Sequence, residues 1–506
     1  MGTNSNRLQS TVAGTDAAAA HHKPAHDTQP DHSQHLVDEA RRLASRVDKL
    51  VSGEQGKSHL DREMDQLLAQ VEPLLEQLVS HVTAQHLPLD HDGERVAMAA
   101  DKLMKHVAVA YLEVAQDASK RPLGINFKLA LRRDTQRGAE FSARRVQLSS
   151  RLKRVPSYAN WRLMRGFFEL ARKHNFASTP PDGGGPSVQE RYIGALLLAL
   201  ADGTMVDRGG YDFMLDFIAR HANMAQIITW HPGTPSSGHG RFHLGPGGMV
   251  SARSNSQMPD AEFADGSLLL DCTGLLANVS AQLRELREPQ FMPEDVVDNG
   301  PDSVGREAVL RHLYQQWGSP PTRRHHRSQF LPRAALHQGV PGICRALAGK
   351  ANGEAESEWA IVDESPTGFG LRIVAGTSQD IQPGTLIALQ PKSEHQTYLG
   401  VVQRVVSGAR RSLDAGIEVL GMQARAHMAV PSDKRGLALG QPCAVLTISL
   451  VPGFAGKTGL IAMPDAVSAE QFLDIQVDGR KHCLRVVQRE LRRSGFELFL
   501  VESVYR

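Results

Sequence analysis

Apolar positions in the first part of the chain recur with the period of an α-helix. Between residues 35 and 117, three stripes place apolar side chains three and four residues apart, which puts them on one face of a helix. The stripes run from Leu36 to Leu50, from Met64 to Val82 and from Val96 to Tyr111. Pro73 falls inside the second stripe and should kink or shift that helix. The pattern predicts amphipathic helices that pack against each other.

The helical period returns after a basic segment and continues, with interruptions, as far as residue 317. Stretches rich in Gly, Pro and Ser interrupt it, and we interpret them as loops. The predicted helical stretches are 156–225, 274–288 and 303–317, and the predicted loops are 176–187, 230–265 and 289–302. The last helix should end at Gly318 and Pro320, which are typical helix-terminating residues.

From Ser319 onward, the pattern changes to the alternation that is typical of strands. The predicted strands are 326–333, 358–363, 368–375, 384–390, 397–406 and 413–420. A further β region covers about 438–505, where Asp478-Gly479 suits a two-residue hairpin turn. Closing such strands into a barrel removes the exposed edges that a short β domain otherwise leaves open.

These elements predict an α+β protein with several domains, as a chain of 506 residues leads one to expect. A mostly α-helical N-terminal region precedes an antiparallel β-barrel and a small C-terminal β module. The predicted divisions are a disordered tail (1–34), a helical region with a basic segment (35–175), a mainly helical region with a Gly/Pro/His-rich loop (176–317), the barrel (318–425) and the C-terminal module (438–506).

Composition narrows the class of protein. Hydrophobic residues make up 41% of the chain and charged residues 22%, which is the ordinary composition of a globular protein. The net charge of +2 argues against a protein whose whole surface binds polyanions. The four Cys stand far apart without a C-x-x-C pair, so neither a disulfide framework nor a Cys-based zinc site is expected. We find no transmembrane span and no signal peptide, and we expect a cytoplasmic protein.

The segment 121–174 is strongly basic. Eight basic side chains lie close together in it: Arg132, Arg133, Arg137, Arg144, Arg145, Arg151, Lys153 and Arg154. A polyanion or an acidic protein surface is one candidate partner, and a solvated helix face is the other interpretation. Aromatic residues do not alternate with these Arg, which weakens the case for stacking on nucleic-acid bases.

Histidines raise the question of a metal site. Five lie near the N-terminus and three lie in the Gly/Pro-rich loop: His21, His22, His26, His32 and His35, and then His231, His239 and His243. The first group fits a solvated tail, and the second lacks a carboxylate or Cys partner at a familiar ligand spacing. We therefore predict no metal. Because the chain has no Ser-His-Asp elbow, H-E-x-x-H, Walker loop or Rossmann fingerprint, we also predict no catalytic residues.

Candidate binding residues lie at the start of the β region. Arg323 and Arg327 are four residues apart, and Asp363, Ser365 and Gly368 form D-x-S-x-x-G at a turn between two predicted strands. Two Arg at this spacing can bind an anion or the edge of a purine base. A carboxylate, a hydroxyl and a Gly that permits φ > 0 and close backbone approach can complete such a site at a strand turn.

This combination of R-x-x-x-R with D-x-S-x-x-G resembles the PilZ domain, a small β-barrel family that binds the bacterial second messenger cyclic di-GMP. The resemblance covers about residues 319–422. It implies a PilZ-like barrel, cyclic di-GMP as the ligand with no other cofactor, and ligand contacts from Arg323, Arg327, Asp363, Ser365 and Gly368. Arg324 lies between the two Arg and either assists or points away.

One departure from the family concerns spacing. More residues than usual separate Arg327 from Asp363, and the excess corresponds to an insert at 337–357, which a longer strand hairpin would accommodate. The resemblance implies a bacterial receptor that relays the level of the second messenger to the helical region or to a partner protein. A hypothesis for the relay is that the ligand orders the Arg loop and fixes the helix 303–317 relative to the barrel.

Three rival functions stay open on the sequence. A nucleic-acid-binding protein would use the basic segment and a barrel of the OB type. An unrecognised enzyme would lie in the helical half, near the His- and Gly-rich loop. A scaffold would retain the barrel without its ligand.

Overall fold

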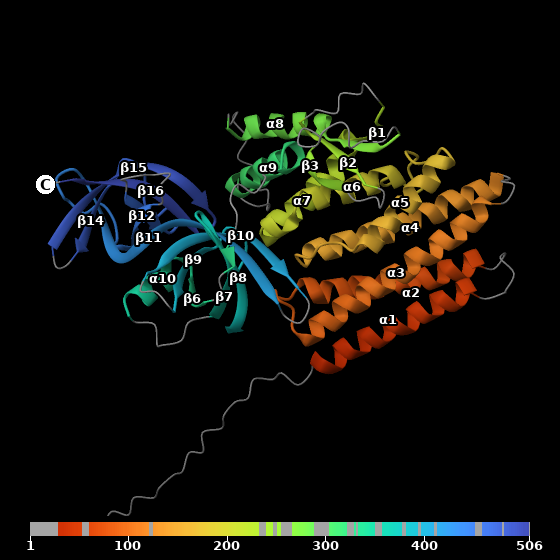
Figure 1. Cartoon of the computed structure of the whole chain (residues 1–506), viewed down its shortest axis with the longest axis horizontal. Coiled ribbons are helices and arrows are strands. Elements are labelled where there is room, and N and C mark those ends of the chain that lie inside the picture. Colours follow the sequence, from red (N-terminus) through yellow and green to blue (C-terminus); the bar gives the residue numbers. More distant parts are fainter. Residues whose placement is uncertain are drawn as a thin grey trace, which may run out of the picture.

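The chain combines a helical region with a β region, so the α+β class is confirmed (Figure 1). A computed structural model describes residues 29–52, 60–120, 125–231, 239–245, 250–254, 266–287, 303–320, 328–329, 332–349, 357–376, 381–392, 396–408, 412–450, 458–477 and 480–504. None of the helices in these ranges has both the length and the apolar content that crossing a membrane requires.

Long helices build the N-terminal region, as the apolar stripes predict. They are α1 (Gln29–Ser52), α2 (Leu60–Thr83), α3 (His91–Ser119), α4 (Ile125–Arg151), α5 (Tyr158–Lys173), α6 (Val188–Leu200) and α7 (Arg208–His221), with short 3₁₀ turns η1 (Gly203–Met205) and η2 (Ala222–Met224). α2 continues past Pro73. Side chains cap several helix starts: Asp90 accepts from the Gly93 amide, and Ser187 with Glu190 forms a capping box on α6.

The start of α1 corrects one prediction. The expected disordered tail extended to residue 34, whereas α1 begins at Gln29 and includes His32 and His35. Pro30 fits the earlier start, because Pro is favoured in the first turn of a helix. The remainder of the predicted tail, with His21, His22 and His26, lies outside the described residues.

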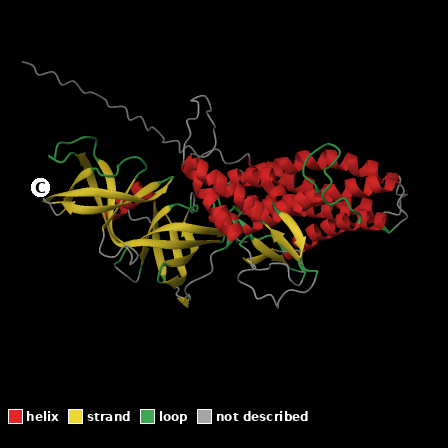
Figure 2. Ribbon diagram, turned by 90° about the horizontal axis from the view of Figure 1, so that it is seen from above, coloured by secondary structure: helices red, strands yellow, loops and turns green. Residues whose placement is uncertain are grey.

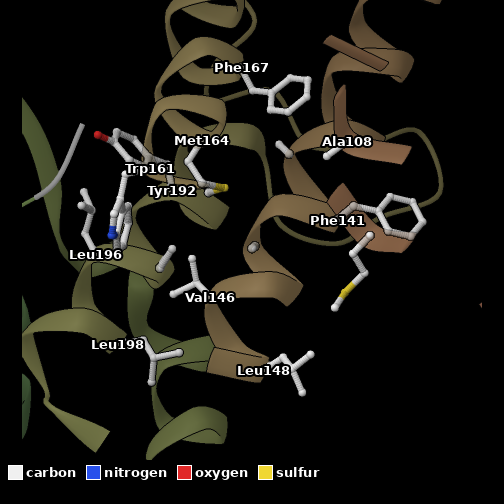
Figure 3. Packing of buried hydrophobic residues seen from close by; sticks show 14 of the residues in the cluster. Ala108, Phe141, Val146, Leu148, Trp161, Met164, Phe167, Tyr192, Leu196 and Leu198 are labelled. Atoms are coloured by element: carbon white, nitrogen blue, oxygen red, sulfur yellow. The ribbon is translucent and has the colours of Figure 1, made fainter. Parts of the chain in front are cut away.

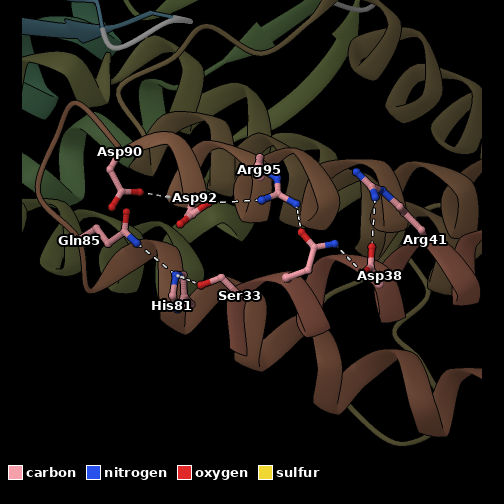
Figure 4. Close-up of polar contacts among 10 residues, drawn as sticks. Ser33, Asp38, Arg41, His81, Gln85, Asp90, Asp92 and Arg95 are labelled. Carbon is pink, nitrogen blue, oxygen red and sulfur yellow. Dashed lines mark hydrogen bonds and ion pairs between the residues drawn. The ribbon is translucent and has the colours of Figure 1, made fainter. Parts of the chain in front are cut away.

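A single hydrophobic core joins these helices. Figure 3 shows α4, α5 and α6 contributing large side chains to it, among them Phe141, Phe167 and Tyr192. Trp161 and Phe167 are 2% and 0% exposed, so these aromatic side chains belong to the core. Polar contacts tie α1, α2 and α3 together at the surface (Figure 4). There, Arg95 binds Asp92 and Gln34, and His81 contacts both Ser33 and Gln85.

Strands occur where the sequence predicted a Gly/Pro/His-rich loop. The strands β1 (Gln226–Thr229), β2 (Arg241–Leu244), β3 (Val250–Ser254) and β4 (Leu268–Asp271) form an antiparallel sheet in the order β1-β4-β2-β3. The loop interpretation of 230–265 is therefore wrong for β2 and β3. The signal was weak because these strands are only four and five residues long. Helices α8 (Thr273–Arg287) and α9 (Ser303–Gly318) follow as predicted.

The β region contains two rings of paired strands. The first consists of β6 (Arg333–Gln338), β7 (Ser357–Ser365), β8 (Gly368–Gly376), β9 (Leu386–Pro391), β10 (Tyr398–Ser407) and β11 (Leu413–Ser432). All pairings are antiparallel, and they run β6-β7-β8-β11-β10-β9 and return to β6. Its interior is a separate apolar cluster that includes Trp359 and Ile417.

The second ring shares β11 with the first. β12 (Cys443–Leu450), β13 (Thr458–Ala462), β14 (Phe472–Val477), β15 (Arg480–Arg493) and β16 (Phe496–Val504) complete it. The pairings run β11-β12-β13-β16-β15-β14 and return to β11. Val477 pairs with Arg480, which fits the predicted two-residue turn, although residues 478–479 lie outside the described residues. Figure 2 shows both strand groups beside the helical region.

A helix occupies the place where an extended hairpin was predicted. The insert 337–357 contains α10 (Gly339–Leu347), and the predicted strand 326–333 is replaced by β5 (Ser328–Gln329) and by β6, which starts only at Arg333. Val340 and Ile343 of α10 are fully buried between the outer side of the first ring and the strands of the second. Burial of these apolar side chains explains why the insert forms a helix at this junction.

A glycine at the crossing of α3, α4 and α5 provides a test of this packing. A Cβ atom added to Gly138 would lie 2.3 Å from Cζ of Phe167 and 2.9 Å from Cβ of Tyr111. We expect Gly138→Ala to lower the free energy of unfolding by about 1–3 kcal/mol, because overpacking outweighs the higher helix propensity of Ala. Urea unfolding followed by helical circular dichroism measures this change.

Gly166→Ala is the matched control, because its added Cβ would lie 3.4 Å from Cδ2 of Leu112, an ordinary contact. That variant should be neutral or more stable by about 1 kcal/mol or less. Equal unfolding midpoints for the two variants would contradict the packing described for Gly138.

Candidate ligand-binding site

The D-x-S-x-x-G motif forms the hairpin that joins β7 to β8. Ser365 pairs with Gly368 across the turn, and the Ser365 hydroxyl donates to the Gly368 carbonyl at 3.2 Å. A Cβ atom on Gly368 would lie 2.1 Å from the carbonyl oxygen of Ile417 on β11. Gly368 is therefore required for close approach of two strands. The expectation of a positive φ is wrong for this residue, which is extended within β8.

Strand register aligns a row of four residues on the outer face of the first ring. Arg404 on β10 pairs with Gly416 on β11, Gly416 with Gly370 on β8, and Gly370 with Asp363 on β7. Adjacent strands lie about 4.8 Å apart, so the row spans roughly 14 Å. Directly paired residues point to the same face of a sheet, so an arginine and a carboxylate face the solvent side across two residues without side chains.

Two β-bulges turn the ends of this row outward. Val402 and Ile361 point into the core of the ring, and strict alternation would point Arg404 and Asp363 inward as well. The register shifts between Val402 and Arg404, and again between Ile361 and Asp363. A bulge inserts one residue and so re-aims the side chains that follow it. The charged ends of the row therefore depend on two local irregularities.

A pocket of about 530 Å³ lies over this row. The glycines form part of its floor, and Asp363, Ser365 and Gly368 lie at one end. Met205 of η1 also lines it, so the helical region contributes to the wall. The volume falls within the range that is typical of small-molecule sites.

The charges around the pocket are unequal. Three carboxylates line it, while Arg404 is the one cation among its described lining residues. Arg372 binds Asp414 through two hydrogen bonds of 2.7 and 2.8 Å, which also raise the pKa of Arg372. Glu418 accepts from Gln403 at 2.6 Å. A dianionic ligand would therefore need further cations at this pocket.

The predicted arginines Arg323, Arg324 and Arg327 lie outside the described residues. The short strand β5 begins one residue after Arg327, and it pairs with β7 in the register Ser328 to Glu364 and Gln329 to Asp363. The stretch 319–327 therefore connects the end of α9 to a strand that lies beside the D-x-S-x-x-G turn. Sequence positions 323–327 belong to this connection.

The helical region meets the first ring through a buried lysine. Lys153 follows α4 with a left-handed φ of 57°, and its ammonium donates to the carbonyls of Gly203 and Val206 around η1. Its own carbonyl accepts from the Ser407 amide on β10 at 3.1 Å. Burial lowers the pKa of Lys153 to about 8. The residue therefore joins α4, η1 and β10 at one point.

The basic segment has partners within the protein. Seven of its Arg side chains form ion pairs: Arg132 with Asp182, Arg133 with Asp134, Arg137 with Asp65, Arg144 with Glu72, Arg145 with Asp101, Arg151 with Asp212 and Arg154 with Glu94. Arg145 is 5% exposed and also donates to Asn160 at 3.0 Å. These side chains stabilise contacts between helices, which weighs against the nucleic-acid interpretation.

Histidines and cysteines do not converge. Within the described ranges, no three His, Cys, Asp or Glu side chains are placed to hold a metal ion, and this includes His231, His239 and His243. His239 instead contacts Ser319, and its ring packs against Tyr314 at 5.7 Å. None of the four Cys forms a disulfide.

Sequence reasoning missed Arg404, Gly370 and Met205. Gly370 was hidden inside the strand G-F-G-L that follows the motif, and a second Gly two residues after Gly368 was the available signal. Arg404 gave no signal, because the alternation of β10 would place it inside the ring. Met205 reaches the pocket only through the tertiary arrangement.

Comparison with known families concerns the helical region. Residues 32–232 match a family model described as the N-terminal domain of the cyclic-di-GMP receptor FimW. The match covers α1 to β1, with all but the first residues of α1, and ends before the β rings. The comparison with curated proteins gave no match. A receptor family for cyclic di-GMP is thus indicated by a part of the chain that does not contain the D-x-S-x-x-G motif.

Lys153 leads to a prediction about pH. Its pKa in the folded state, about 8, is below the usual value of about 10.5, so the unfolded chain binds more protons between these values. The stability of the native protein, relative to Lys153→Met, should therefore rise from pH 8 to pH 10.5, by at most about 3 kcal/mol. Below pH 8 the difference should be constant. Urea unfolding of both proteins across this range measures it, and a difference that falls with pH would contradict the burial described.

Proposed function

We propose that this protein is a cyclic di-GMP receptor and that the ligand binds in the pocket over β7, β8, β11 and β10. The observation that carries the proposal is the row from Asp363 to Arg404, with Gly370 and Gly416 between them. The strands that carry this carboxylate and this guanidinium lie about 14 Å apart, a spacing that suits a ligand with two bases and two phosphates. The FimW match adds independent support, because it comes from other residues.

Each sequence-predicted residue then has a role. Asp363 accepts hydrogen bonds from the N1–H and N2–H₂ edge of a guanine, and Ser365 hydrogen-bonds beside it. Gly368 lets β8 approach β11 closely enough to form the end of the pocket. Arg323, Arg324 and Arg327 supply the cations that the described lining lacks. The first ring is in this view a PilZ-like barrel.

The protein acts as a receptor in the bacterial cytoplasm, without a catalytic step and without a metal or other cofactor. The relay to the helical region starts at the connection between α9 and β5, which contains the three arginines. α9 is anchored to α6, because the Trp317 indole donates to the Leu197 carbonyl at 3.0 Å and His312 donates to that of Ala201 at 2.5 Å. Ordering of the connection by a ligand changes the surface that the helical region offers to a partner protein.

Calorimetric titration tests the ligand. We expect the intact protein to bind cyclic di-GMP and not cyclic di-AMP or GTP. Asp363→Asn and Arg327→Ala should each weaken binding by about 5- to 150-fold, the loss expected from removing one bidentate contact to a base. Glu364→Gln is the control, because Glu364 is adjacent in sequence but does not line the pocket. If the folded protein shows no heat of binding with cyclic di-GMP, the proposal is wrong.

Hydrogen exchange tests the relay. Saturating cyclic di-GMP should slow amide exchange in residues 303–330 and leave the far β14–β15 hairpin unchanged. The comparison with Arg327→Ala under the same conditions separates ligand ordering from an effect of the nucleotide on the solution. Tight binding without any change in 303–330 would reject the relay and leave the binding site in place.

A further inference from the structure

Arg404 faces the pocket with part of its hydrogen-bonding capacity unused. It lines the wall opposite Asp363, and its side chain is 43% exposed. Its Nε donates to the Thr204 hydroxyl at 3.0 Å, and the same atom lies 4.0 Å from the Asp202 carboxylate. Among the described residues, its two terminal amino groups have no hydrogen-bond partner. A guanidinium held by Nε alone leaves the rest of its fork available to an acceptor.

Thr204 and Asp202 fix the direction of this guanidinium. The Thr204 hydroxyl donates its proton to the Asp202 carboxylate, which also accepts from the Thr204 amide at 3.3 Å. A hydroxyl has one proton, so its remaining lone pairs are left to accept from Arg404. Thr204 is 5% exposed, and burial holds its side chain in this orientation. The helical region therefore supplies the acceptor that aims an arginine of the β region.

The turn that holds Thr204 is itself fixed. Lys153 binds the carbonyls on both sides of it, and His312 of α9 donates to the Ala201 carbonyl just before it. Asp202 has a left-handed φ of 45°, a conformation that Asp tolerates better than most residues. Contacts from α4 and α9 thus determine the position of Thr204 relative to the pocket.

We propose that Arg404 is a ligand-binding residue that contacts an anionic group of the nucleotide, and that Asp202 and Thr204 position it. This inference rests on the proposed function. The site is then composite: Asp363 recognises a base at one end of the glycine row, and Arg404 binds a phosphate at the other. Affinity for the ligand depends on the helical region through Thr204.

Titration of the full-length protein with cyclic di-GMP tests both parts. Arg404→Gln should weaken binding about ten- to a hundredfold, the usual loss for a hydrogen bond to a charged group, and Arg404→Lys should weaken it less. Thr204→Val should weaken binding severalfold, and Thr204→Ser should restore it. Arg425→Gln is the charge-matched control, since Arg425 is exposed on β11 and does not line the pocket. Unfolding midpoints of all variants verify that they are folded.

A double variant separates positioning from stability. If Thr204 acts through Arg404, Thr204→Val should have no further effect on affinity in the Arg404→Gln background. An equal loss in both backgrounds would overturn the positioning role. If Arg404→Gln binds within twofold of the native protein while Asp363→Asn does not, the composite site is wrong and the receptor function stands. If the native protein binds no cyclic di-GMP, the proposed function itself fails.

Discussion

The continuity of β11 is the constraint on which the β region depends. This strand is 20 residues long and pairs with four others, β8 and β10 in its first part and β12 and β14 in its second. Its register shifts between Met422 and Arg425, where Gln423 adopts a left-handed φ of 56°. A bulge bends a strand and increases its twist, which lets one strand leave the first ring and enter the second. The two rings therefore share a covalent backbone, and a shift of β11 in one ring displaces it in the other.

Periodicity predicted most of the architecture, because it reports directly which face of an element is buried. The long helices and the strands at 357–376 and 398–420 lie close to their predicted positions. Short elements were missed: β2 and β3 are too brief to show a period, and α10 lies in a stretch rich in Gly and Ala. The site was predicted in part. Asp363, Ser365 and Gly368 form a local motif, whereas Arg404 joins them only through register and a bulge, which the sequence alone does not reveal.

Charge counted along the sequence was a poor guide to partners. The basic segment was a candidate polyanion-binding surface, yet its arginines from Arg132 to Arg154 meet carboxylates that lie about 40 to 70 residues away for all but the Arg133–Asp134 pair, as for Arg144 with Glu72 and Arg145 with Asp101. Most of these pairs are partly exposed and individually weak. Together they determine how the helices align, because a buried arginine such as Arg145, which donates to both oxygens of the Asp101 carboxylate, fixes the position of one helix relative to another. The pocket is the opposite case. Arg404 is the one cation in its described lining, and the terminal amino groups of this arginine have no hydrogen-bond partner among the described residues.

The glycines in the pocket floor affect the shape of the pocket and not the apolar core of the ring. Gly416 has open space above it, where an added Cβ would only meet Cβ of Arg404 at 3.6 Å, and neither it nor Gly370 adds a side chain to the core of the ring. The apolar interior around Trp359 and Ile417 stabilises the ring whether or not the outer face is hollow. A methyl group at Gly416 would occupy part of the hollow while the ring persisted, whereas a Cβ atom at Gly370 would lie 2.3 Å from Oδ1 of Asp363 and displace that carboxylate. Such a variant would keep the fold of the ring and lose the space that its outer face offers to a ligand.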